Sequence, residues 1–148
     1  MTPNAKPSEH LAVLATIDPS SSSAAQNSAW VSAANFHAFL AIIKVGIMTA
    51  TGTLDAKFQQ ALDNAGTGAK DIAPAKAITQ LLAAGGNNRQ VLLNMKAADL
   101  DVEGQFKFIR LVVTAATAAS LVDATLVGAY PRYEDGALFN QAGVAQVV

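Results

Sequence analysis

Residues 53–63 constrain the fold of this chain most, because apolar and polar side chains alternate along them. The apolar positions of the alternation are Leu54, Ala56, Phe58 and Leu62. Only Gln60 interrupts that side. Successive side chains of a strand point to opposite faces, so the pattern predicts a strand with one buried and one solvated face. An alanine-rich chain favours helices by composition, yet the clearest segment of this one has a two-residue period.

Other segments predict further strands. Residues 36–48 fit either a helical face or a strand buried on both sides; Gly46, the β-branched residues and the turn sequence at 49–52 favour a strand. Placed before 53–63, that strand predicts an antiparallel hairpin.

Three more strands are expected over 90–96, 106–114 and 120–129. In the first of these strands Val91, Leu93 and Met95 are predicted to share one face. In the second, Ile109, Leu111 and Val113 are predicted to share one face, which Lys107 joins at the end. Short strands separated by Gly and Asn turns predict a mainly β protein, an antiparallel β-sandwich with a jelly-roll-like arrangement.

The connections contain one ambiguous segment. Residues 64–70 predict a turn, because their glycines allow a positive φ. Residues 74–84 fit two elements. One is a short helix that begins at Pro74 and ends before Gly85 and Gly86, and the other is a short strand over 78–82.

The domain prediction has three parts. Residues 1–29 are expected to form an N-terminal arm, 30–133 the β-sandwich body, and 134–148 a C-terminal arm. Within the first arm, 11–17 is apolar enough to pair with something, and the Ser/Ala-rich residues 18–28 predict a flexible link.

Composition excludes several classes of function. The chain has 148 residues, which indicates one domain with a real core. A net charge of −1 with no basic stripe argues against nucleic-acid binding, and zero cysteines exclude disulfides and thiolate chemistry. The apolar run 38–50 contains Lys44 and is shorter than the roughly 20 residues of a membrane span, so no membrane association is expected. With 51% apolar and only 14% charged residues, much apolar surface is expected to be covered by other subunits or partners.

Neither histidine predicts catalysis. His10 lies in the expected arm and His37 beside aromatic residues, and their spacings match no Ser-His-Asp motif. Structural or surface roles are the simpler interpretation, so no catalytic residue and no cofactor is predicted.

Two further patterns resemble ligand sites only in part. Asp99, Asp101 and Glu103 alternate, so three carboxylates of an extended segment could converge on a hard cation; the alternative is a solvated turn before 106–114. Residues 66–70 resemble a phosphate loop but lack its spacing, which favours a plain turn. No metal ligand is therefore predicted.

Three aromatic residues lie at the edges of the predicted body. Trp30, Tyr130 and Tyr133 could form a carbohydrate platform, but anchors at the points where the arms leave the sandwich are the simpler interpretation. Arg132 could pair with a carboxylate of a neighbouring subunit.

Several sequence segments, in the order in which they occur, resemble those of a known protein family. These segments are TLDAKFQQALDNAGTGAKDI, KAITQL, DLDVEGQFKFIRLVVT and GAYPRY. Together, over roughly residues 11–148, they are similar to small structural proteins encoded among the head genes of tailed bacteriophages. The alanine-rich sequence of residues 115–119 departs from that family. The resemblance implies a virion structural protein with a jelly-roll-like fold and no active residues.

The resemblance and the composition together predict a function. The expected protein is a non-enzymatic capsid decoration or cement protein on the outer capsid surface of the virion, which stabilises the phage head by bridging subunits of the major capsid protein. A homo-oligomer is expected, with a trimer favoured. The alternatives are a tail or head–tail connector component, and a carbohydrate-binding module.

Overall fold

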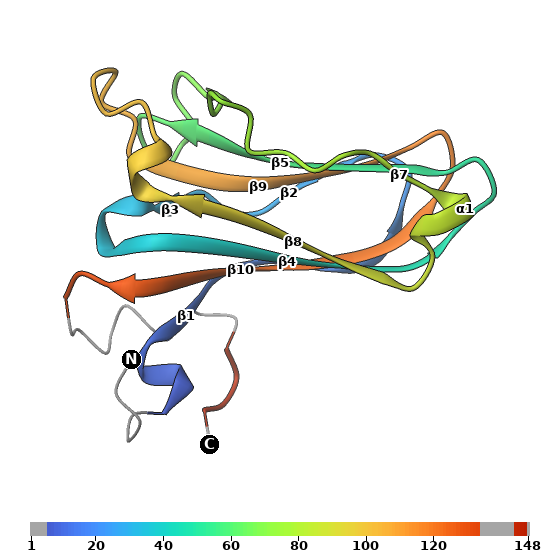
Figure 1. Ribbon diagram of the computed structural model, residues 1–148, viewed down its shortest axis with the longest axis horizontal. Coiled ribbons are helices and arrows are strands. Elements are labelled where there is room, and N and C mark those ends of the chain that lie inside the picture. Colours follow the sequence, from blue (N-terminus) through green and yellow to red (C-terminus); the bar gives the residue numbers. More distant parts are fainter. Residues whose placement is uncertain (1–5, 134–143, 148) are drawn as a thin grey trace.

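Two antiparallel sheets lie face to face in the computed structural model, which describes residues 6–133 and 144–147 (Figure 1). Sheet A has the order β1-β10-β4-β8, and sheet B the order β2-β9-β5-β6, with β3 paired to β9 and β7 to β5. The strands of sheet A are β1 (Leu11–Ser22), β10 (Ser120–Pro131), β4 (Phe36–Met48) and β8 (Arg89–Lys96). Those of sheet B are β2 (Ala25–Asn27), β3 (Val31–Ser32), β9 (Phe108–Ala116), β5 (Thr53–Ala61), β6 (Lys70–Asp71) and β7 (Leu81–Leu82). The helical pieces are η1 (Pro7–Glu9), η2 (Ala33–Asn35), α1 (Ala83–Gly86) and η3 (Ala97–Asp99).

The core lies between the sheets and follows the alternation of the strands. In β5 the buried side is that of Leu54, Ala56 and Phe58, and the buried Gln60 shares it. Its oxygen accepts a hydrogen bond from Asp101 N–H at 2.9 Å, which explains how an amide is tolerated there. The other buried positions come from both inner faces, among them Phe39, Ile43, Ile109, Leu111, Val113 and Leu126. The predicted mainly β sandwich is therefore confirmed, and the more specific jelly-roll arrangement stays a prediction.

The predicted hairpin between 36–48 and 53–63 is wrong, although both strands exist. β4 belongs to sheet A, where β10 and β8 occupy its two edges, so no edge is left for β5. β5 instead pairs with β9 in sheet B, from Thr53 opposite Ala116 to Ala61 opposite Phe108. The chain therefore crosses from one sheet to the other between Met48 and Thr53.

Most of the predicted N-terminal arm is not an arm. β1 pairs with β10 from Leu11 to Ser22, with two register shifts, and β2 adds to β9 in sheet B. The side chains of Ala12, Leu14 and Ile17 are buried in the core, which is the physical reason that the segment is held. The boundary expected at residue 29 therefore cuts through the sandwich. The expected C-terminal arm lies mostly outside the described residues.

The short helix predicted over residues 74–84 does not form, and the strand predicted over 78–82 is present only as β7 at its end. Residues 76–78 run extended beside β5, where Phe58 N–H donates to Lys76 O at 2.8 Å and Ile78 N–H donates to Ala56 O at 2.9 Å. β7 then pairs with the start of β5, and the single turn α1 begins at Ala83. Gly86 closes that turn against Met48, since a Cβ at this glycine would lie 2.7 Å from the methionine sulfur.

Candidate functional site

The outer face of sheet A carries apolar side chains that no described element covers. We call it the sheet A apolar face; its members are Leu11, Val13, Leu40, Ile42, Ile47, Leu92, Leu121 and Val127. The strand registers join them into rows, because Val13 lies opposite Val127 and Val127 opposite Leu40, while Ile42 lies opposite Leu92. The rows span all four strands of the sheet.

The exposure of this face is highest at two places. Ile47 is 64% exposed and Leu121 45% exposed where β4 bulges against β10, and Leu92 is 59% exposed on β8. Polar residues interrupt the face, notably the ion pair of Lys44 Nζ with Asp123 Oδ2 at 2.6 Å. Large exposed apolar areas rimmed by polar groups are typical of interaction surfaces.

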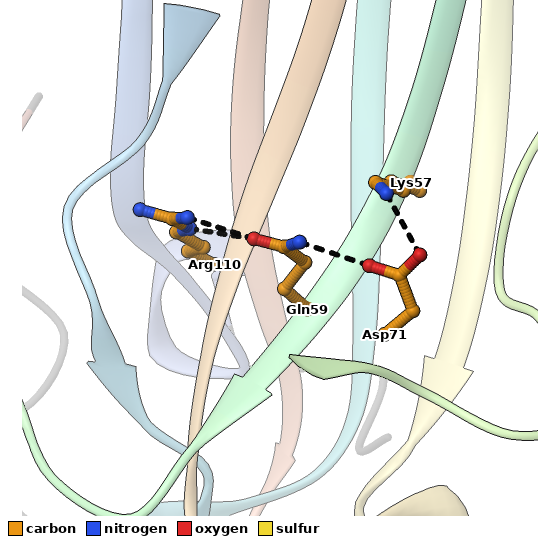
Figure 2. A network of polar contacts seen from close by, with 4 residues as sticks. All are labelled: Lys57, Gln59, Asp71 and Arg110. Atoms are coloured by element: carbon orange, nitrogen blue, oxygen red, sulfur yellow. Dashed lines mark hydrogen bonds and ion pairs between the residues drawn. The ribbon is translucent and has the colours of Figure 1, made fainter. Parts of the chain in front are cut away.

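The outer face of sheet B is polar and is organised by one connected network (Figure 2). Arg110 donates from Nε and Nη2 to Gln59 Oε1 at 3.0 and 2.8 Å. Gln59 Nε2 then donates to Asp71 Oδ1 at 2.9 Å, and Lys57 Nζ pairs with Asp71 Oδ2 at 2.7 Å. The hydrogen bonds from Lys57 and from Gln59 hold the pKa of the Asp71 carboxyl below its usual value. The network ties β9, β5 and β6 together.

An open pocket of about 330 Å³ lies beside this network. Its lining residues are Asp55, Ala56, Lys57, Ala77, Ile78, Val112 and Thr114. Each charged group on its wall has a partner within the chain, since Asp55 Oδ2 accepts from Gln80 Nε2 at 2.7 Å and Lys57 pairs with Asp71. Both charged side chains of the pocket are therefore held in contacts within the chain.

The alternating acidic residues do not converge on a cation site. Asp99 Oδ2 accepts from Lys96 N–H at 2.7 Å and pairs with Lys76 at 3.1 Å. Asp101 pairs with Lys70 at 2.6 Å and accepts from Gly104 N–H at 2.8 Å. The described residues contain no group of three or more His, Asp or Glu side chains that could hold a metal ion.

The same contacts set the protonation of the two carboxylates. The bond from Lys70, followed by that from Gly104, lowers the pKa of Asp101. Burial raises the pKa of Asp99, but the bonds from Lys96 and Lys76 outweigh it, so this pKa also ends below its usual value. Both carboxylates therefore stabilise the turn before β9. This agrees with the turn interpretation of the sequence and not with the cation site.

The glycine-rich residues 66–70 form a turn and not an anion site. Asp63 Oδ1 accepts from the N–H groups of Ala65 and Thr67, both at 3.0 Å, so a carboxylate occupies the position an anion would need. Those bonds, led by Thr67, lower the pKa of Asp63. Gly66 and Gly68 have φ values of 86° and 66°, which favour glycine.

The two histidines are not brought to a catalytic arrangement. His37 is exposed near the start of β4, and His10 follows η1. Among the described residues, neither side chain has a hydrogen-bond partner.

The described part of the chain contains no helix long and apolar enough to cross a membrane.

The three aromatic residues considered as a platform are divided between the sheets. Trp30 precedes β3 in sheet B, and the Arg110 guanidinium lies 4.6 Å from the centre of its ring, where a sugar would have to stack. Tyr130 and Tyr133 are exposed at the end of β10 in sheet A. Arg132 is exposed there, and its backbone N–H donates to Asn35 O at 2.8 Å.

The sequence interpretation missed the sheet A apolar face. Its signal was present at Leu40 and Ile42, which make 36–48 apolar on both parities, and at Leu92, which is apolar on the otherwise polar parity of 90–96. The network of sheet B also had a signal, because Lys57 and Gln59 alternate with buried residues of β5.

Several solved structures match this chain. The crystal structure of the SPBc2 prophage-derived protein YomS matches with a TM-score of 0.44 and 10% sequence identity, over 80% of this chain and 93% of that one. The neighbour is a prophage-derived protein. At this level of similarity the match carries no argument about function. No family model matches the chain. No curated protein matches it in sequence.

Proposed function

We propose that this chain is a non-enzymatic structural protein of a tailed-phage virion, placed on the outer capsid surface as a decoration or cement protein. In this role it would bind the major capsid protein and stabilise the head by bridging its subunits. The observation that carries the proposal is the sheet A apolar face, which extends over four strands with no described element covering it.

Three further points support a structural role. The phrases of the sequence resemble head-cluster proteins of tailed phages. The charged groups of the sheet B pocket are already paired within the chain, which fits a structural role for that network. The rigid two-sheet core holds the exposed face in one shape, which reduces the conformational entropy lost on binding.

The binding energy of such a protein would be mainly hydrophobic. Exposed ion pairs contribute only about 0–1 kcal/mol each, and this chain has few charges. Apolar burial contributes about 25 cal/mol per Å² before association costs are subtracted. Attachment should therefore survive raised salt and weaken in mild denaturant.

The decisive experiment measures the disruption temperature of phage particles with and without this protein across a salt series. A protein that binds the assembled shell better than separated subunits raises that temperature by mass action. Equal disruption temperatures would refute the cement role, and release by moderate salt alone would refute the hydrophobic mechanism. Copy number tests the position: hundreds of copies indicate the capsid, whereas about six to twelve indicate a ring in the tail or connector.

A pair of variants tests the surface itself. Ile47→Asp places a charge at the most exposed position of the sheet A apolar face and should weaken attachment to particles. Val102→Asp is the control, because Val102 is 70% exposed in the loop before β9 and lies outside that face. Equal attachment of the two variants would show that the face is not the contact.

A further inference from the structure

The free edge of β8 differs from the other sheet edges of the described structure. On the opposite edge of sheet A, β1 shifts register against β10 twice and contains Pro19. The edges of sheet B consist of strands of two or three residues. β8 has eight residues, pairs with β4 from Arg89 to Lys96 without a register shift, and contains neither Pro nor Gly.

The free side of β8 also lacks partners within the described residues. Apart from its ladder with β4, the backbone of β8 makes one hydrogen bond, from Lys96 N–H to Asp99 Oδ2. A long, regular edge of this kind is a template for strand addition, and proteins that remain monomeric usually interrupt it with bulges, prolines or inward charges. β1 carries two register shifts and a proline, whereas β8 carries charges only at its two ends, Arg89 and Lys96.

We propose that β8 pairs antiparallel with β8 of a second copy, with Leu92 of one copy opposite Leu92 of the other. In this register Gln90 lies opposite Asn94 of the second copy. On the inner side Val91 lies opposite Leu93. Directly opposite side chains share a face, so over residues 90–94 the register matches apolar with apolar and amide with amide.

Two features select this register over its neighbours. Leu92, which is 59% exposed in the single chain, becomes covered by its own counterpart, and an amide pair flanks it on each side. A shift that moves the two-fold axis to Leu93 would place Leu92 opposite Asn94 and Gln90 opposite Lys96, which loses the apolar match. A shift of the pairing by a single residue would place outward-facing residues of one copy opposite buried residues of the other.

The charges at the ends of β8 do not oppose this pairing. Arg89 would lie opposite Met95 and Lys96 opposite Asn88, so no two cations face each other. The two Arg89 residues would be about 20 Å apart along the strands at about 3.4 Å per residue. That separation exceeds the Debye length of about 8 Å at physiological ionic strength, so their repulsion is largely screened.

The pairing fixes the type of oligomer. Each copy uses its β8 edge once, so a two-fold axis closes the assembly as a dimer with one continuous sheet across both copies. This replaces the trimer that the sequence favoured, because a ring would need β8 to pair with the bulged β1 edge. The inference goes beyond the proposed function and does not depend on where the protein sits in a particle.

The first test is the mass of the purified full chain in solution, measured by sedimentation over a range of concentrations. The wild-type chain should be a dimer. Leu92→Lys places two ammonium groups directly opposite each other and should weaken dimerisation about tenfold or more. Leu121→Lys is the control, because this exposed leucine on β10 is separated from β8 by β4, and it should leave the dimer intact.

The second test determines the register by disulfide cross-linking. Because the chain has no cysteine of its own, only the introduced cysteines can form disulfides. Leu92→Cys should form a disulfide-linked dimer on mild oxidation. Gln90→Cys and Asn94→Cys should each fail alone and cross-link when the two variants are mixed. Leu121→Cys should not cross-link.

Clear results would overturn the proposal. A monomer at every concentration, a trimer, or a dimer that Leu92→Lys leaves unchanged would each show that β8 is not the self-pairing edge. Cross-linking of Leu121→Cys as efficient as that of Leu92→Cys would show the same.

Discussion

Phe58→Ala tests the core of the sandwich most directly. The side chain of Phe58 is fully buried, at 0% exposure, in the middle of β5, which β9 flanks on one edge and the extended residues 76–78 on the other. Truncation of a buried Phe removes its transfer free energy and leaves a cavity, which together cost about 3–5 kcal/mol. The surrounding strands are held by their ladders and can collapse only partly into the space.

The expected change in melting temperature follows from chain length. The entropy of unfolding is about 2.1 cal/mol/K per residue, which gives about 0.31 kcal/mol/K for 148 residues. A loss of 3–5 kcal/mol therefore lowers the melting temperature by about 10–16 °C. Differential scanning calorimetry measures the shift, and far-UV circular dichroism verifies that the variant still forms strands.

The matched control is Lys57→Ala, one position earlier on the same strand and on its outer face. It removes the partly exposed pair with Asp71, which is worth at most about 1 kcal/mol, so the melting temperature should fall by about 3 °C or less. If both variants shifted the melting temperature equally, or if Phe58→Ala left it unchanged, the assignment of inner and outer faces in β5 would be wrong.

Three more perturbations have defined outcomes. Gly66→Ala should lower the melting temperature, because Gly66 has a φ of 86° and a Cβ there would lie 2.6 Å from Trp30 Nε1; Gly85→Ala, which meets no atom within 4 Å, is the control for calorimetry. Acidification should reduce the free energy of unfolding: the lowered pKa of Asp71 contributes stability above the ordinary carboxyl pKa of about 4 that is lost as pH falls through the folded-state value, and Asp71→Asn should flatten the acid limb of a pH titration of unfolding. Deletion of residues 1–22 should abolish cooperative unfolding, because it removes β1 and its buried side chains; a truncated chain that melts like the full one would show that β1 is dispensable.

The alternating carboxylates of residues 99–103 show why a local sequence pattern does not establish a metal site. Alternate residues converge only if the segment is extended, but Ala97–Asp99 is a 3-10 turn, so Asp99 and Asp101 point to different lysines. These lysines, Lys76 and Lys70, come from segments more than twenty residues earlier in the chain. Local spacing contains no information about such partners.

The functional surface was predictable only in part. The two-parity apolar pattern of 36–48 predicted a strand buried on both sides, and the strand is confirmed as β4. Its outer residues Leu40 and Ile42 are half-buried, because no described element covers that side of sheet A. A sequence shows that both faces are apolar, but not whether a second layer is present to cover each of them.

The sequence by itself determined the central strands β4, β5, β8, β9 and β10, and the buried parity of β5 and β9. The alternation in 53–63 and 106–114 selected Phe58, Leu111 and Val113 as core residues, because the two-residue period of a strand is a local property of the backbone. The tertiary structure decided which strands are neighbours. β4 and β5 follow each other in the chain yet lie in different sheets, and β1 joins the sheet from a segment expected to be an arm, because pairing depends on which distant edges remain free when both sheets close over one core.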